Sequence, residues 1–395
     1  MKKLYVAGVA AIIIVIAIVS RLYFRSDERN ERLHYEREET ELIIANLPLA
    51  DFTIYKAGTS LQDAVALSPI DRERVWLAPG NYFLKADLGA RAFFYPLPMV
   101  SYRGGPDKEG TLTVTIRSPQ ADYPHGLLPD SPDFVFIPSG HFLFGDHLRV
   151  QEPHYVWLGG FFISPFEVSN AEFRQFMSDS RGYANDANWT EAGRKWKAAN
   201  PSHVTAQLKP TDGEFERFGQ PDQPVVNVNW FEANAYCHWL SNTIGGGKWI
   251  FALPTEAEWE KAARGPDNFD YALGMNISDN EARLYNWKKN PGAEVTVVGF
   301  RETKSKYQPN RYGLYHMTGN VAEWTQSVYR TYSRQHPYID DDDRNHDEMP
   351  GERVLRGGSW YTASIAVLYI PYRENFRPEI QTPYLGVRVV ARPVP

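Results

Sequence analysis

The N-terminal part of the chain separates apolar from charged positions into two consecutive blocks. Behind two lysines, an unbroken apolar run extends from Leu4 to Val19, and residues 22–24 continue it with apolar and aromatic side chains. A helix that crosses a hydrocarbon core needs about 20 such residues, so the run predicts a membrane anchor over residues 1–24. A cleaved signal peptide is the alternative, but bulky residues continue past Ser20, where small residues are typical of a cleavage site.

The charges that flank this run bear on its orientation. Arginines on its carboxyl side outnumber the lysines on its amino side, which by the positive-inside rule favours a cytoplasmic body. Long domains translocate largely regardless of flanking charge, however, and acidic residues alternate with these arginines. We therefore expect a single-pass inner-membrane protein whose C-terminal body lies in the periplasm.

A highly charged segment follows the apolar run. Residues 25–45 contain no Gly or Pro and pair Glu with Arg at helical spacing, as in Glu28 and Arg32. The pattern predicts a charged stalk helix over residues 25–48. A short dimerising coil is the alternative, but the few apolar residues make too sparse a seam for heptads.

The period of the apolar positions then changes from helical to alternating. Short alternating runs separated by Gly and Pro turns predict a small all-β module over residues 51–118. The proline-rich residues 119–132 indicate a linker.

Helices and short apolar strands alternate in the remainder of the chain. Helices are predicted over residues 169–177, 230–240 and 255–264. Ser169 and Thr255 each precede a Glu by three residues, which is the spacing of a capping box. The helix between them places apolar residues on one face. Little is periodic over residues 264–312, so the pattern predicts a loop-rich α+β domain over residues 133–395.

The amino-acid composition excludes several classes of partner and site. The formal net charge is −6, which provides no basic field for a phosphate backbone, so we expect no nucleic-acid partner. Cys237 is the single cysteine, which excludes an intramolecular disulfide and a Cys-rich zinc site. We expect this thiol to be a small buried apolar group on a helix.

Seven ordered sequence blocks resemble the formylglycine-generating enzyme (sulfatase-modifying factor) family. The blocks are FVFIPSGHFLFG (134–145), FFISPFEVSNAEFRQF (161–176), PVVNVNWFEANAYCHWL (224–240), LPTEAEWEKAARG (253–265), NRYGLYHMTGNVAEW (310–324), RVLRGGSW (353–360) and LGVRVV (385–390). The resemblance implies that family's fold, a loop-rich α+β domain related to C-type lectins.

The resemblance also locates the family's catalytic positions. Its oxygen-using members bind Cu(I) through two cysteines that follow the GGSW motif, and the matching positions here are Thr362 and Val367. The resemblance therefore implies a member without the copper chemistry, and we expect no copper. The family's sulfoxide synthases hold iron through histidines of an added helical domain, which nothing before residue 133 resembles.

Calcium is the one cofactor that the resemblance favours. By position, Glu323 would supply a carboxylate, and Gly319 and Val321 would supply carbonyl oxygens, the ligands that Ca²⁺ prefers. His316 stands at a fourth position that is normally Asn or Asp, and imidazole is a poor calcium ligand. Alternatively, Glu323 is a buried carboxylate paired with an arginine such as Arg356.

Other charged residues in these blocks have structural interpretations. We expect Arg356, Arg373 and Arg388 to brace loops by bonding to carbonyls and carboxylates. The GGSW glycines are expected to permit close backbone packing. The acidic residues 340–348 predict a solvated loop, with cation coordination as the alternative.

The segment that covers the substrate groove in active relatives is apolar and aromatic here, over residues 361–376. Such a cluster marks a protein interface when it is exposed, although a buried strand would have the same composition. Our candidate partner-binding residues are Trp360, Tyr361, Tyr369, Tyr372 and Arg373.

Three functional hypotheses follow. The first is a membrane-anchored, non-catalytic protein of this family that binds a protein partner in the cell envelope, with an accessory, scaffold or effector-neutralising role. The second is a metal-dependent oxidoreductase of the same superfamily that uses ligands other than cysteine. The third is a calcium-dependent, lectin-like binder.

Overall fold

The computed structural model describes twelve stretches of the chain. They are residues 40–45, 51–67, 74–88, 91–99, 111–115, 134–145, 153–203, 218–277, 307–332, 338, 342–362 and 364–394. The anchor predicted over residues 1–24 and the linker predicted over residues 119–132 lie outside them. Among the described residues, no helix combines the length and the apolar character needed to cross a membrane.

The chain divides into two compact units. The first comprises residues 1–45, 69–80 and 99–113, and the second comprises residues 46–68, 81–98 and 114–395. The strands of the first sheet are β1 (Thr40–Ala45), β4 (Arg74–Leu77) and β7 (Thr111–Thr115), in the order β4-β1-β7. β1 and β4 are antiparallel, with Thr40 opposite Leu77.

β1 corrects the stalk helix predicted over residues 25–48. Residues 40–45 form a strand, because their backbone groups pair with those of β4 and because Ile43 and Ile44 are β-branched. Residues 25–39 lie outside the described part of the chain.

A four-stranded sheet forms where the sequence alternation predicts strands. Its members are β2 (Asp51–Lys56), β3 (Val65–Leu67), β5 (Gly80–Leu88) and β6 (Arg91–Met99), in the order β3-β2-β5-β6. Phe52 and Ile54 of β2 are buried and alternate with more exposed neighbours, as expected for a strand with one covered face.

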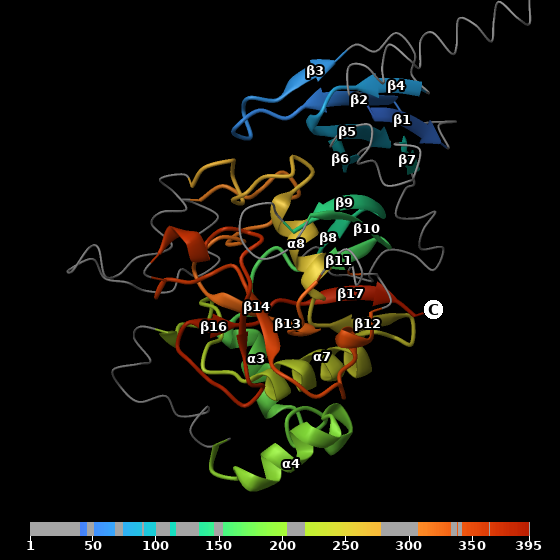
Figure 1. The fold of residues 1–395 in the computed structure, drawn as a ribbon. Helices are drawn as coiled ribbons and strands as arrows, with labels where there is room; N and C mark the ends of the chain where they lie inside the picture. The colour runs from blue at the N-terminus through green and yellow to red at the C-terminus, as the bar shows by residue number, and fades with distance from the viewer. Residues whose placement is uncertain are drawn as a thin grey trace, which may run out of the picture. The chain divides into compact units, whose positions relative to one another are not determined.

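Short strands and helices build the C-terminal region as a mixed α and β fold (Figure 1). One sheet has the order β12-β17-β11-β8, a second has the order β15-β14-β13-β16, and β9 pairs with β10. The strands are β8 (Val135–Ile137), β9 (Gly140–Phe144), β10 (His154–Leu158), β11 (Phe161–Ile163), β12 (Trp249–Ala252), β13 (Ala322–Val328), β14 (Arg353–Arg356), β15 (Glu374–Phe376), β16 (Leu385–Gly386) and β17 (Val390–Pro393).

All three predicted helices are confirmed. They are α3 (Asn170–Ser178), α7 (Trp230–Ile244) and α8 (Glu256–Arg264). The capping boxes predicted at Ser169 and Thr255 are both present, and Asn229 caps α7 in the same way. Further helical elements, which are not predicted above, are α4 (Glu191–Ala199) and the short 3₁₀ elements η2 (Asp186–Asn188), η4 (Asp343–Asn345) and η5 (Ile365–Val367).

One apolar core of the described residues forms around α7, which lies against β12 (Figure 1). The Trp230 indole donates to the carbonyl of Thr325, and the Trp324 indole donates to that of Val228. These bonds satisfy the polar atoms of two fully buried rings. Cys237 lies in this core with no exposed surface, which confirms its predicted role as a buried apolar group.

Candidate functional site

α8 contacts the GGSW motif, which the family's catalytic positions follow in the sequence. Every residue of this helix is buried, so its charged side chains find their partners inside the domain. Arginines from the C-terminal strands and loops supply those partners. Glu258, for example, accepts from two nitrogens of Arg392, with Nε 2.6 Å from Oε1.

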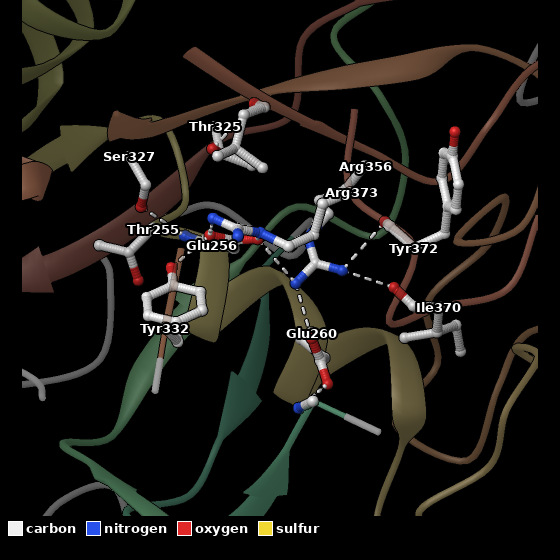
Figure 2. Close-up of polar contacts among 12 residues, drawn as sticks. Thr255, Glu256, Glu260, Thr325, Ser327, Tyr332, Arg356, Ile370, Tyr372 and Arg373 are labelled. Carbon is white, nitrogen blue, oxygen red and sulfur yellow. Dashed lines mark hydrogen bonds and ion pairs between the residues drawn. The ribbon is translucent and has the colours of Figure 1, made fainter. Parts of the chain in front are cut away.

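Glu256 is the centre of the first buried cluster (Figure 2). Arg373 approaches it with two nitrogens, and Nη2 lies 2.7 Å from Oε2. Tyr332 donates its hydroxyl to the same carboxylate. The Arg373 guanidinium also lies 4.4 Å from the centroid of the Tyr332 ring. Such a bidentate, stacked arrangement fixes both side chains in one geometry.

Glu260 binds a second arginine one turn along α8. Arg356 Nη2 lies 2.6 Å from Glu260 and 3.1 Å from Glu256. Figure 2 shows the same guanidinium reaching the carbonyls of Ile370 and Tyr372, at 2.6 and 3.1 Å. Arg356 therefore ties the chain segment around residue 370 to α8, which confirms the predicted bracing role.

The charges within this cluster compensate one another. Burial by itself would raise the pKa of Glu256, but Arg373 and then Arg356 outweigh burial and hold this pKa below its usual value. Glu256 consequently stays ionised, and its contribution to stability is lost as the pH falls below the ordinary carboxyl range.

The GGSW turn packs directly on α8. Gly357 and Gly358 have φ values of +93° and +64°, in the left-handed region. A Cβ atom at Gly357 would lie 3.2 Å from the Trp259 ring, and one at Gly358 would lie 2.8 Å from a Leu368 methyl group. The predicted role of these glycines in close backbone packing is confirmed.

The two positions that match the family's copper ligands form part of this scaffold. Thr362 is 9% exposed, and its hydroxyl accepts a bond of 2.9 Å from the backbone of Ser359. Val367 is half-buried and ends η5. The single thiol, Cys237, is buried elsewhere on α7, and burial raises its pKa well above the ordinary value. A protonated, inaccessible thiol is a poor nucleophile and a poor metal ligand.

Glu323, the predicted calcium ligand, belongs to a second buried cluster. Its two oxygens accept from Arg388 at 2.8 to 3.0 Å, and the Trp259 indole adds a bond of 2.7 Å. Arg388 also donates to the carbonyls of Ser164 and Tyr315. Burial raises the pKa of Glu323, and Arg388 offsets part of that effect. The charge of this carboxylate is therefore compensated within the chain.

Arg356, the partner suggested for Glu323 from sequence, lies opposite it only in the β13–β14 ladder. Its guanidinium forms an ion pair with Glu260 of α8 instead. Glu323 and Arg356 are therefore neighbours across the two strands, but their side chains bind different partners. The general expectation of a buried carboxylate paired with an arginine is confirmed, with Arg388 as that arginine.

His316 contacts Glu167, which lies 3.9 Å from the Arg388 guanidinium of this cluster. Its Nδ1 lies 2.8 Å from one oxygen of Glu167, and Asn320 donates to the other at 2.9 Å. Gly319 bonds through its backbone to Gly357, and Val321 is fully buried. No group of three His, Cys, Asp or Glu side chains in the described residues is arranged to hold a metal ion.

Aromatic rings gather next to the GGSW motif. We call the stacked pair of Tyr361 and Tyr384 the aromatic surface. Tyr361 stacks on Tyr384 at 5.1 Å between centroids and meets Trp360 edge-on at 5.6 Å. Tyr361 is 44% exposed, as is the nearby Ile365. Apolar groups are therefore accessible close to the two positions that lack cysteine.

The five predicted partner-binding residues differ in how far they are exposed to solvent. Arg373 and Trp360 are buried, at 6% and 7% exposure, so their assignment to an exposed contact surface is corrected. Arg373 faces Glu256, and the Trp360 indole donates to the chain at Pro383. Tyr361 is exposed, while Tyr369 and Tyr372 are half-buried.

The acidic loop is better anchored than its sequence predicts. Asp347 accepts from Gln326 and lies 2.8 Å from Nε2 of His238 on α7. Glu348 accepts from the backbone of Glu191 at the start of α4. The prediction of a solvated loop holds for Asp343 and Glu348, which are exposed, but it is wrong for the buried Asp342.

Sequence reasoning missed Glu256 and Glu260 as the partners of the expected arginines. A signal was present, because the two residues are four apart in a predicted helix and so share one face. Tyr384 was also missed, since its contact with Tyr361 joins distant positions in the chain and no local pattern marks it.

Replacing Glu256 tests the first cluster. We expect Glu256→Ala to lower the free energy of unfolding by about 3–5 kcal/mol, because it leaves Arg373 and Arg356 buried without their shared carboxylate. Denaturant titration measures the loss. The matched control is Glu379→Ala, which removes only an exposed pair with Arg377 and is expected to cost less than about 1 kcal/mol. Equal losses in both variants would refute the argument.

Adding calcium tests the second cluster. Because Arg388 already binds both oxygens of Glu323, we expect millimolar Ca²⁺ to leave the unfolding temperature of the wild-type chain unchanged. Thermal unfolding with Ca²⁺ and with chelator measures this. A calcium-dependent rise that Glu323→Gln abolishes would instead support the calcium site predicted from sequence.

The contact between His238 and Asp347 predicts a pH dependence. Burial would lower the pKa of His238, but Asp347 outweighs it and raises this pKa above 6.5. The contribution to stability is therefore complete below pH 6.5 and is lost as the pH rises through the folded-state pKa. We expect a loss of up to about 1 kcal/mol, which His238→Gln and Asp347→Asn should each abolish. Unfolding curves that shift in parallel with pH in all three proteins would contradict this.

Several known proteins are similar to this chain in sequence. The mouse inactive C-alpha-formylglycine-generating enzyme 2 is 30% identical over 258 residues, covering 58% of this chain and 74% of that protein. The Streptomyces coelicolor formylglycine-generating enzyme is 31% identical and covers 57% and 78%. The hercynine oxygenase of Mycolicibacterium thermoresistibile is 33% identical and covers 60% and 52%.

A solved structure, Treponema denticola variable protein 1, matches 68% of this chain and 98% of its own, with 25% identity and a TM-score of 0.48. The family described as the sulfatase-modifying factor enzyme 1-like domain matches residues 122–393. That match covers most of the chain, including both buried clusters and the GGSW turn. The chain belongs to the sulfatase-modifying factor enzyme 1-like family of domains.

Proposed function

We propose that this protein is a non-catalytic member of its family that binds a protein partner. The observation that carries the proposal is the state of the two copper-ligand positions. Thr362 uses its hydroxyl to hold the turn at Ser359, and Val367 is apolar, so neither can become a thiolate. The similarity to a relative named as inactive supports the same interpretation.

The aromatic surface supplies the contact in this proposal. Tyr361 and Tyr384 form a stacked pair that needs no further ordering before it binds, which lowers the entropic cost of association. Aromatic side chains that pack against a rigid scaffold are frequent energetic centres of protein interfaces. Behind Tyr361, Trp360 is fixed by its bond to Pro383 and by stacking on Phe218 at 5.5 Å.

We propose a location for the partner on the basis of the N-terminal sequence. With an anchor over residues 1–24 and a body on the periplasmic side, the aromatic surface would meet proteins of the cell envelope. The role would be that of an accessory, scaffold or effector-neutralising protein. This part of the proposal depends on the anchor as well as on the aromatic surface. Separate experiments test the two.

A second candidate is a metal-dependent oxidoreductase with ligands other than cysteine. The similarity to hercynine oxygenase favours it, because that relative is named for an oxygenase activity. Metal analysis of the purified chain separates the candidates. Stoichiometric iron or copper would favour the oxidoreductase, whereas the first proposal requires no redox metal.

Substitutions on the aromatic surface test partner binding. We expect Tyr361→Ala to reduce co-purification of a partner from solubilised membranes by about tenfold or more, as for the loss of an interface hot spot. Ile365→Asp should act in the same direction because it places a charge on the neighbouring exposed apolar position. Cross-linking of the full chain in its native membrane, followed by quantitative mass spectrometry, measures both effects.

The control is Ile250→Asp, at a position on β12 that is exposed to a similar extent. It should keep the partner. If Tyr361→Ala retained every protein captured by the wild-type chain, partner binding by this surface would be excluded. Fractionation of cells that express the chain with and without residues 1–24 tests the anchor independently.

A further inference from the structure

A pocket of about 380 Å³ opens between residues 164–172 and α7. Phe166, Tyr236 and Phe251 contribute aromatic walls, and Leu240 and Ile244 of α7 add aliphatic ones. The volume lies toward the lower end of the range for small-molecule sites, roughly 300–1,000 Å³. The aromatic surface contributes no residue to this pocket.

The charged residues that line the pocket are both acidic. Glu167 and Glu172 belong to its wall, and no Lys, Arg or His does. Glu167 already binds His316 and Asn320. Glu172, by contrast, accepts only from the backbone and hydroxyl of Ser169, and no ion pair with it forms within the described part of the chain. Glu172 is exposed, and none of the residues that line the pocket supplies a cation to it.

Tyr236 places a polar group in the same apolar wall. Its residue is 3% exposed, and its ring packs against Phe173 and Phe176 of α3. Burial, followed by the charge of Glu172, raises the pKa of Tyr236 well above its usual value, so the hydroxyl keeps its proton. As a lining residue it can offer its hydroxyl as a hydrogen-bond donor or acceptor to a ligand in the pocket.

We propose that this pocket binds a small primary organic ammonium ion that carries an apolar body. The ammonium group would bond to Glu172 and to the Tyr236 hydroxyl, since an ionised donor and acceptor make the stronger class of hydrogen bond. The apolar body would lie against Leu240 and Phe251, where it is removed from water. The aromatic faces add further attraction for a cation.

A series of three isosteric probes tests the charge requirement. Phenethylamine, 2-phenylethanol and phenylacetate share one apolar body and differ in charge, and isothermal titration calorimetry with the full chain measures their affinities. We expect phenethylamine to bind about tenfold more tightly than the alcohol, and phenylacetate to bind more weakly still. Equal affinity for all three, or no binding of phenethylamine, would overturn the proposal.

Variants then assign the contacts. Glu172→Gln retains an oxygen for the capping box and removes the charge, so we expect it to weaken phenethylamine binding about tenfold without unfolding α3. Tyr236→Phe removes only the hydroxyl and should weaken binding by a smaller factor. Ile244→Lys, at an exposed position of the wall, should abolish binding by placing a competing cation there.

The matched control is Glu191→Gln, which neutralises an exposed glutamate in the first turn of α4. It should bind phenethylamine with wild-type affinity. Loss of affinity in this control equal to that in Glu172→Gln would show that overall charge, and not the pocket, determines binding, and would overturn the proposal. Circular dichroism of each variant confirms that α3 and α7 are retained.

Discussion

The domain depends on the neutralisation of carboxylates that a fully buried helix carries into its interior. Glu256, Glu258 and Glu260 of α8 pair respectively with Arg373, Arg392 and Arg356. Each arginine comes from a different C-terminal segment. Since a buried charge without its partner costs several kcal/mol, α8 and these segments can reach their native positions only together. Folding of α8, which lies in the middle of the chain, therefore requires the C-terminal segments that supply these arginines.

Buried arginines also provide hydrogen bonds for backbone groups that lie outside regular structure in this loop-rich domain. Arg356 bonds to the carbonyls of Ile370 and Tyr372, and Arg388 bonds to those of Ser164 and Tyr315. A guanidinium offers five donors in a fixed plane, so it can hold a carboxylate and two carbonyls at once. Irregular segments are thus ordered without additional strands.

This scaffold does not require the catalytic thiols. The turn that would present them is held by the glycines of the GGSW motif, by the Thr362 hydroxyl and by the contact with Trp259. A member of the family can therefore lose its metal ligands and keep its surface, because function belongs to the site and not to the fold. The aromatic surface and the acidic pocket would be two recognition sites on one unchanged frame.

Local patterns in the sequence determined the capped helices, the strands and the absence of thiols at the catalytic positions, because capping spacing and residue identity act over a few neighbouring residues. For Glu323 the sequence offered two interpretations, a calcium ligand and a carboxylate paired with an arginine. Only the tertiary structure decided which arginine meets which carboxylate, since those contacts join residues up to 134 positions apart. It also placed residues 40–45 in a strand and buried Arg373, because pairing and burial depend on what distant segments bring together.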